Sequence, residues 1–487
     1  MRTSGRTFRG LRRRRRSSWR RGVILPIVLV IFILLAMLAI SFGFLARAEY
    51  SGMAAQARLQ QARFCAMGGL EGAALLLRQH FNEPALWYNN PALFQDREVY
   101  GEGSEEDRRA WRFSLVGYNL DSDQATRYGI TDEAGKLNLN VASPDQLYRL
   151  IAPRCAPGMA ESLVASLLDW RESGSEARPG GAKDTYYMML TPPYRCKQGP
   201  LDTVEELLLV KGFTADIVYG EDMNRNGMLD ANEDDGDGSL PLDNGDGVLD
   251  RGLYPYVTVY SREPEVTDGN PYMPRVNMTI WPEGVADKLR PELAAFLVQA
   301  RDGKADFGKT PANLVGMQVG KGGSTFVSPA TEEDLPAVMD LLTTGYHVHD
   351  DGFVYGRINV NTASRTVLGT IGKLTPEEID AILSVRNRLT DEARKTTAWL
   401  VTEKVLTLDK YKEVAYLFTA RSYQFTVESI GYGDYDGLQC RLQTVMELRL
   451  PRVQYVYFRD LTEFGASYRL GEFEQDDVIV TQESGRD

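Results

Sequence analysis

The chain has 487 residues, more than one compact hydrophobic core normally supports, so two or more globular units are expected. Its formal net charge is −12, but residues 1–22 hold ten arginines and no acidic residue, which leaves about −22 on the remainder. An acidic body argues against nucleic-acid binding, which needs a basic surface. Three histidines leave little material for histidine-based catalysis.

The basic leader runs through Gly22 into an uncharged apolar stretch, residues 23–46. At 1.5 Å per residue, a helix of this length crosses the roughly 30 Å hydrocarbon core of a bilayer. The arginines precede the stretch and only Arg47 follows it closely, so the positive-inside rule predicts a cytoplasmic N-terminus and an exported body.

Three interpretations of this stretch stay open on the residues alone. A discarded secretory signal would use the A-x-A sequence at 46–48, although signal cores are shorter, about 7–15 residues. An uncleaved signal anchor fits the length. In the third interpretation the leader is cut off after Gly22, and the apolar helix is kept with Val23 as its first residue. Helical spacing of small and apolar residues continues through 47–82, which predicts an amphipathic continuation outside the membrane.

Alternating apolar and polar residues predict strands at 111–120, 126–132 and 254–261, and a hairpin at 422–431 and 438–448 around the turn YGDYDG. A small antiparallel sheet packed on the long helix accounts for these strands. Beyond about residue 451 there is no clear core pattern apart from VQYVYF.

A motif is repeated in the chain. Residues 135–143 read GKLNLNVAS, residues 356–364 read GRINVNTAS, and a fainter copy, RVNMT, lies at 275–279. Each full copy predicts a short strand followed by a helix, with Ser143 or Ser364 as the N-cap. A further helix is expected after Thr375.

Helix-hairpin-helix DNA-binding modules also open in this way. Their turn needs two glycines that bring backbone amides to a phosphate. Here the turn reads Gly372-Lys373-Leu374, so the second glycine is missing. Together with the acidic body, this favours packing over DNA binding.

Residues 222–233, DMNRNGMLDANE, have the spacing of an EF-hand calcium loop. Gly227 would make the sharp turn. Ca²⁺ takes six to eight hard oxygens, and few sequences place so many by accident. The predicted ligands are the side chains of Asp222, Asn224, Asn226, Asp230 and Glu233 and the carbonyl of Met228.

An echo of this loop follows twenty residues later, but its positions 1 and 12 would be Leu242 and Leu253. A second, weaker Ca²⁺ site is therefore predicted only if other acids are recruited; a solvated acidic loop is the alternative. Its candidate residues are Asn244, Asp246 and Asp250 with Asp235, Asp237 or Asp243.

Cys155 and Cys196 are the best candidates for a disulfide if the body lies outside the cytoplasm; unpaired thiols are the alternative. The chain contains no G-x-S-x-G, P-loop, H-E-x-x-H or C-x-x-C sequence, so we predict no catalytic residues and no small-molecule substrate.

A basic leader, a glycine before the apolar run, and a helix half membranous and half soluble resemble the N-terminus of type IV prepilins and pseudopilins. Such chains usually carry Glu at mature position five, where this chain has Ile27. That departure, the repeated N-x-N-x-A units and the segments SLLDWRE, RPGGAKDTYY and GPLDTVEELLLVKG resemble the minor pseudopilin K family of type II secretion systems, in which the Glu is expected to be missing.

The resemblance implies an α+β pseudopilin fold, a long N-terminal helix packed on a small antiparallel sheet, with a large inserted helical domain. The expected parts are the leader (1–22), the transmembrane helix (23–46), its periplasmic continuation (47–82), the first αβ part (83–140), the helical insert with the acidic loop (141–252), an additional αβ subdomain (253–350), the second N-x-N-x-A unit (351–420), the C-terminal hairpin (421–450) and a tail (451–487).

The resemblance further implies a non-enzymatic subunit of the bacterial inner membrane with a single span. Prepilin peptidase would cut after Gly22, Val23 would be N-methylated, and the subunit would join I-type and J-type minor pseudopilins at the pseudopilus tip. The alternatives are a signal-anchored periplasmic calcium-binding module and a DNA-binding or DNA-uptake protein.

Overall fold

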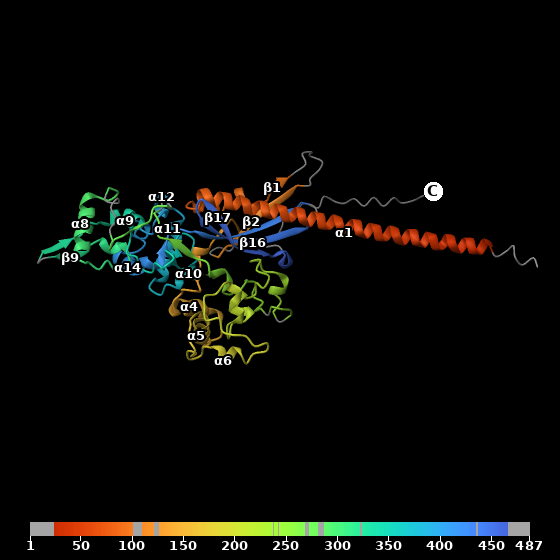
Figure 1. Ribbon diagram of the computed structural model, residues 1–487, viewed down its shortest axis with the longest axis horizontal. Helices are drawn as coiled ribbons and strands as arrows, with labels where there is room; N and C mark the ends of the chain where they lie inside the picture. The colour runs from red at the N-terminus through yellow and green to blue at the C-terminus, as the bar shows by residue number, and fades with distance from the viewer. Residues whose placement is uncertain are drawn as a thin grey trace, which may run out of the picture. The chain divides into compact units, whose positions relative to one another are not determined.

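The computed structural model describes residues 24–100, 110–120, 126–236, 238–241, 243–267, 272–280, 287–321, 324–434 and 437–465 (Figure 1). The chain divides into two compact units, residues 1–60 and 61–487. The described part of the first unit is helical throughout and belongs to α1 (Ile24–His80). Pro26 lies in the first turn of α1, where a missing N–H removes no intrahelical hydrogen bond.

The second unit contains a seven-stranded antiparallel sheet with the order β1-β2-β15-β16-β17, in which β3 pairs with β2 and β4 with β15. The strands β15 and β16 are almost wholly buried. The bounds are β1 Arg97–Tyr100, β2 Trp111–Tyr118, β3 Thr126–Tyr128, β4 Thr131–Asp132, β15 Gln424–Gly433, β16 Gln439–Arg449 and β17 Arg452–Asp460.

Within this unit, α1 packs very closely on the sheet. A Cβ atom added at Gly431 of β15 would lie 2.0 Å from the carbonyl oxygen of Ala62, and one added at Gly69 of α1 would lie 2.4 Å from Ser429 Oγ. Glycine is therefore needed at Gly431 for the helix backbone to approach β15, and at Gly69 it leaves room for the side chains of Ser429 and Phe113. The predicted α+β arrangement, a long helix packed on an antiparallel sheet, is confirmed.

Two of the strand predictions need correction. The segment 254–261 forms only a 3-10 turn, η6 (Tyr254–Tyr256), and the short β6 (Val257–Thr258), because Pro255 has no N–H to donate to a ladder. The predicted tail, 451–487, needs correction at 452–460, which form β17, an edge strand of the sheet; residues 466–487 lie outside the described residues. This edge strand leaves large apolar side chains exposed, since Tyr455 and Phe458 are 41% and 49% exposed. Its sequence therefore does not alternate clearly between buried apolar and exposed polar residues.

The first helix of the insert begins where the sequence predicts. Ser143 and Gln146 form a capping box at the start of α4, with Pro144 at the first position. The first insert helices lie together in Figure 1. Their bounds are α4 Pro144–Ile151, η3 Ala152–Arg154, α5 Ala160–Arg171, α6 Asp184–Tyr187, η4 Val204–Leu209, α7 Ala215–Tyr219 and η5 Ala231–Glu233.

All three copies of the asparagine motif form the same local structure. In each, a two-residue strand ending in Asn pairs in parallel with a two-residue strand ending in Thr. The Asn side-chain oxygen accepts the N–H two residues further on, at 2.9, 2.9 and 3.0 Å. The faint copy at 275–279 is thus a third unit of the same kind. The pairs are β5 Leu137–Asn138 with β6, β8 Val276–Asn277 with β11 Leu342–Thr343, and β13 Ile358–Asn359 with β14 Phe418–Thr419.

Ser364 and Thr375 cap α10 and α11, as predicted. The remaining elements are α2 Pro84–Trp87, α3 Pro91–Phe94, η2 Glu133–Gly135, β7 Arg262–Pro264, α8 Pro291–Asp302, η7 Pro311–Leu314, β9 Gln318–Lys321, β10 Ser324–Val327, η8 Glu332–Asp334, α9 Leu335–Leu341, β12 Phe353–Tyr355, α10 Arg365–Gly369, α11 Pro376–Arg386, α12 Asp391–Arg394, α13 Trp399–Thr402, α14 Leu408–Val414, η9 Ala415–Leu417 and η10 Thr462–Phe464.

Buried apolar side chains form two main clusters. One lies among the helical units between residues 137 and 418, and the other joins α1 to the sheet.

Candidate functional site

The predicted calcium loop, 222–233, follows α7 and closes in η5. Both of its terminal carboxylates are buried, Asp222 at 4% and Glu233 at 1% exposure. The Asp222 carboxylate accepts the N–H groups of Asn226 at 2.8 Å and Gly227 at 3.1 Å. Gly227 has a φ of 73°, which glycine adopts without strain, so the predicted sharp turn is confirmed.

Hydrogen bonds gather the other predicted ligands of this loop into one group. Asn224 and Asn226 donate their side-chain N–H groups to Asp230 Oδ2 at 2.7 and 2.8 Å. Their side-chain oxygens accept the N–H groups of Asn226 and Met228 at 3.0 and 2.7 Å. Glu233 accepts the N–H of Asp230 at 3.1 Å.

The chemistry of this donor set suits a hard cation. Burial, with the nearby charges of Asp222 and Asp230, raises the pKa of Glu233 to about 7. Across the described ranges, no three His, Cys, Asp or Glu side chains form a group that could hold a metal by themselves. A cation here would also need amide and carbonyl oxygens, and Ca²⁺ accepts such a mixed set.

The echo of this loop, 243–250, repeats the same contacts. Asn244 donates to Asp250 Oδ2 at 3.3 Å, and the oxygens of Asn244 and Asp246 accept the N–H groups of Asp246 and Val248, both at 2.9 Å. Asp243 accepts the N–H groups of Gly236 and Gly245. Asn244, Asp246 and Asp250 of the second predicted group therefore repeat most of the hydrogen bonds of the first loop.

Two acids that the sequence reasoning missed complete the echo. The N–H of Gly247 donates to Asp234 at 2.9 Å, just as the N–H of Gly227 donates to Asp222, the first predicted ligand, in the first loop. The N–H of Asp250 donates to Glu221 at 2.7 Å, just as the N–H of Asp230 donates to Glu233, the last predicted ligand, in the first loop. Asp234 and Glu221 thus take positions 1 and 12, where a linear alignment puts leucines. No sequence signal marks them, because folding alone brings them to this loop.

The other acids proposed for the second group behave differently. Asp235 accepts the N–H and hydroxyl of Ser239, at 3.0 and 2.7 Å. Asp237 lies outside the described residues.

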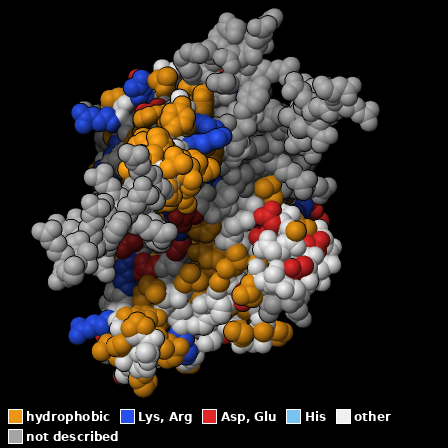
Figure 2. Space-filling view, turned by 90° about the vertical axis from the view of Figure 1, so that its right-hand side faces the viewer, with side chains coloured by type: hydrophobic (Ala, Val, Ile, Leu, Met, Phe, Trp, Pro, Cys, Tyr) orange, Lys and Arg blue, Asp and Glu red, His pale blue; other side chains and the backbone are white. Residues whose placement is uncertain are grey.

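The predicted processing site, Gly22 and Val23, also lies outside the described residues. In the part of the chain that the structure describes, α1 is the one helix long and apolar enough to cross a membrane, and its most apolar window has no residue buried in the structure. Ile27 is 52% exposed. Figure 2, which looks toward the beginning of α1, shows hydrophobic side chains gathered at this end of the helix.

Cys155 and Cys196 are free thiols in the structure. Cys196 is buried and its Sγ lies 3.4 Å from the carbonyl oxygen of Asp169, whereas Cys155 is partly exposed and lies next to the carbonyl of Ala152. Of the two alternatives, the structure contains unpaired thiols, because each sulfur packs against a different part of the insert.

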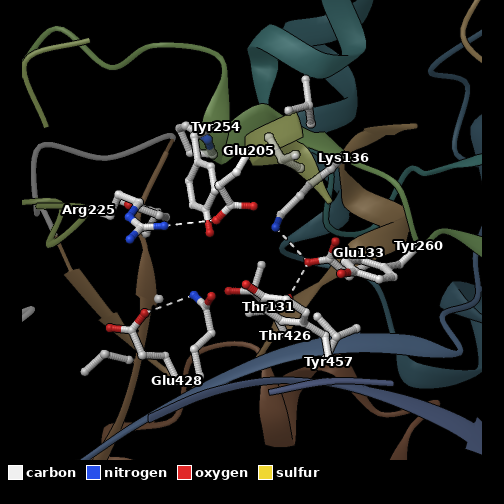
Figure 3. Close-up of a pocket in the computed structure, with 18 of the residues that line it drawn as sticks. Thr131, Glu133, Lys136, Glu205, Arg225, Tyr254, Tyr260, Thr426, Glu428 and Tyr457 are labelled. Atoms are coloured by element: carbon white, nitrogen blue, oxygen red, sulfur yellow. Dashed lines mark hydrogen bonds and ion pairs between the residues drawn. The ribbon is translucent and has the colours of Figure 1, made fainter. Parts of the chain in front are cut away.

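A pocket lined by both apolar and charged side chains lies between the sheet and the insert (Figure 3). On one side, Arg225 of the first loop donates to Glu205 of η4 at 3.0 Å. On the other, Lys136 and Thr426 donate to Glu133 at 2.7 and 2.6 Å. These opposite charges pair with one another inside the pocket. The pocket is therefore a place where the sheet and the insert are joined.

The class of the protein follows from this arrangement. A single long N-terminal helix is packed on an antiparallel sheet, and several helical units are inserted between β4 and β15. This is the architecture expected of a pseudopilin with a large helical insertion.

Comparisons with known proteins narrow the class. Residues 123–219 match the family model for type II secretion system (T2SS), protein K. Type II secretion system protein K of Klebsiella pneumoniae is 28% identical over 210 residues, which cover 40% of this chain and 59% of that protein. A chain in the crystal structure of the GspK-GspI-GspJ complex from enterotoxigenic Escherichia coli is 12% identical, with a TM-score of 0.41, covering 84% of this chain and 98% of that one.

The resemblance stated from the sequence is therefore confirmed over part of the chain, residues 123–219, which match the family model for type II secretion system protein K. The chain spans about 59% of the curated relative that it matches.

Proposed function

We propose that this chain is a non-enzymatic minor pseudopilin of a type II secretion system. The observation that carries the proposal is the family match over 123–219, in a chain whose α1 continues without a break from an apolar stretch into a segment packed on the sheet. Such a helix suits a subunit that is stored in a membrane and then assembled through the same helix.

In this proposal the chain is anchored in the bacterial inner membrane by one span, with the basic leader in the cytoplasm and the body in the periplasm. Prepilin peptidase cuts after Gly22, and Val23 becomes the methylated N-terminus. The support is the strongly basic leader, which no acid balances, directly before the apolar stretch.

The proposed partners are I-type and J-type minor pseudopilins; the solved Escherichia coli complex contains GspK with GspI and GspJ. On this chain, α1 offers a surface for neighbouring helices. Ala62, Ala66 and Leu70 are buried against the sheet, whereas Phe64 and Leu75 are 66% and 53% exposed. Exposed apolar side chains along a helix suit packing against another helix. Since Ile27 replaces the usual acid, the subunit lacks the carboxylate for docking beneath another subunit, which fits a position at the tip.

The experiment that tests processing is mass spectrometry of the mature N-terminus in cells that express the secretion system. We expect a chain that begins with Val23. A Gly22→Glu variant should keep Met1 and fail to assemble, and a conservative Gly22→Ala variant serves as its control. A wild-type chain that keeps Met1 would favour the signal anchor, and one that begins at Glu49 would identify a discarded signal.

We also propose that the loop 222–233 binds Ca²⁺ as a constitutive structural ion. The side chains of Asp222, Asn224, Asn226, Asp230 and Glu233 and the carbonyl of Met228 would hold it, and 221–250 would supply a second site. The bound ion supplies positive charge that offsets the repulsion among buried carboxylates.

Isothermal titration of the full-length chain in detergent tests this proposal. Calcium should bind and raise the melting temperature, and Asp222→Asn with Glu233→Gln should remove binding at the first loop. Asp235→Asn is the matched control, because Asp235 bonds to Ser239 instead. No heat of binding in the wild type would refute the site.

A further inference from the structure

The helical insert and the sheet meet at an interface, called the seam here, in which charged side chains pair with one another. The two main apolar clusters are separate, one among the helical units and one between α1 and the sheet. The pocket in Figure 3 lies along this seam, and Glu205, Arg225, Glu133 and Glu428 line it. Charged and hydrogen-bonded contacts therefore help to attach the insert there.

One buried side chain of the sheet crosses this seam to the calcium loop. Arg441 of β16 is 1% exposed. It donates to Glu428 of β15 at 2.7 Å and to the backbone carbonyl of Asn224 at 3.2 Å, and it also donates to the carbonyl of Arg225. The sheet thus holds the backbone of loop positions 3 and 4 directly.

The loop in turn inserts a side chain into the seam. Arg225, with a φ of 57° and 5% exposure, lies between the loop and the sheet. Its guanidinium donates to Glu205, which also accepts from Arg459 of β17 at 2.6 Å, and it lies 4.5 Å from the ring centre of Phe464. A left-handed conformation at arginine is uncommon, so the loop must keep its shape for this side chain to reach the seam.

A third contact joins the sheet to a proposed ligand. The Tyr118 hydroxyl of β2 lies beside the Asp222 carboxylate. Two strands therefore contact the loop at its first, third and fourth positions, within the stretch that would fold around the ion.

We propose that the calcium loop fastens the helical insert to the pseudopilin sheet, with Arg441 as the positioning residue that couples the ion to β15 and β16. The inference rests on the proposed calcium site at 222–233. Without a cation, the buried carboxylates of Asp222 and Glu233 repel each other and the loop opens. The carbonyls that Arg441 holds then move away, and the sheet loses its contacts with the insert.

Hydrogen exchange on the full-length chain in detergent, with calcium or with a chelator, tests the coupling. In the wild type, calcium should slow exchange in peptides from both the loop and strands β15 and β16. We expect about a tenfold change in the strands, the order of magnitude for losing a hydrogen bond to a charged group. The double variant Arg441→Met with Glu428→Gln removes the coupling without leaving a buried charge alone. In this double variant, calcium should still slow exchange in the loop, but it should no longer slow exchange in β15 and β16.

The pair Arg262 and Glu447 provides the matched control. Glu447 also lies on β16 and accepts from Arg262 at 2.7 Å, with no contact to the loop. The variant Arg262→Met with Glu447→Gln should keep the calcium response of the strands. If the Arg441 double variant does not fold, Arg225→Met with Glu205→Gln removes the ion pair between the loop and η4 instead. In that variant too, calcium should slow exchange in the loop and not in β15 and β16.

Each outcome separates the two proposals. If calcium slows exchange in the wild-type loop but not in β15 and β16, the coupling is overturned and the calcium site is still supported. A calcium response of the strands that survives in the Arg441 variant also overturns it. A wild-type chain in which no peptide responds to calcium overturns the calcium site, and the coupling with it.

Discussion

Replacing Gly431 by alanine tests whether α1 and the sheet meet backbone to backbone. The new methyl group would lie 2.0 Å from the carbonyl oxygen of Ala62 and 2.4 Å from the backbone nitrogen of Ala66. Since carbon atoms pack at about 3.5 Å or more, the helix would have to move away from β15 by about 1.5 Å. Backbone atoms of a helix cannot rotate aside as a side chain can.

The cost follows from the contacts that this movement breaks. Ala62, Ala66 and Leu70 are at most 3% exposed against the sheet. A gap of only 0.5–1 Å forfeits roughly a quarter to a half of a contact's dispersion energy. We therefore expect the upper part of the overpacking range, about 3 kcal/mol of unfolding free energy. For a unit that spans residues 61–487, with an unfolding entropy of about 2.1 cal/mol/K per residue, that lowers the melting temperature by roughly 3 °C.

The assay is thermal unfolding of the full-length chain in detergent, followed by near-ultraviolet circular dichroism. Gly68→Ala is the matched control, because Gly68 is exposed on the same helix and nothing lies within 4 Å of an added Cβ. Alanine there should stabilise the helix by about 1 kcal/mol, the opposite sign. A Gly431→Ala variant as stable as the wild type would refute the close approach.

Three further predictions concern single positions. Burial raises the pKa of Asp132 to about 6 from 3.8. Because the folded pKa is the higher one, this group's contribution to stability is complete below about pH 3.8 and is lost as the pH rises through about 6, up to roughly 3 kcal/mol. Asp132→Asn should therefore flatten the change in stability between about pH 4 and 6, and a pH profile identical to that of the wild type would contradict this. Ser143→Ala removes the capping box of α4 and should cost about 1 kcal/mol in denaturant unfolding, whereas no loss would argue against the cap. Glu221→Gln should remove one of two calcium ions in titration and leave the other, while an unchanged stoichiometry would exclude Glu221 as a ligand.

The sequence by itself determined the features that depend on near neighbours. An uncharged stretch of apolar residues is enough to specify a long exposed helix, and Ser143, Ser364 and Thr375 start helices through their own first turns. The first loop is also local, because Gly227 and the residues around it close on one another within twelve positions. For the same reason the two strong copies of the asparagine motif could be recognised directly.

Tertiary structure alone decided what depends on distant parts of the chain. The edge strand β17 has too little buried alternation to be recognised before β16 lies beside it. Glu221 and Asp234 join the second group because the chain folds back on itself there. Arg441 reaches the first loop across 216 positions. Such contacts depend on which surfaces pack together, and the order of residues along the chain carries no local signal for that.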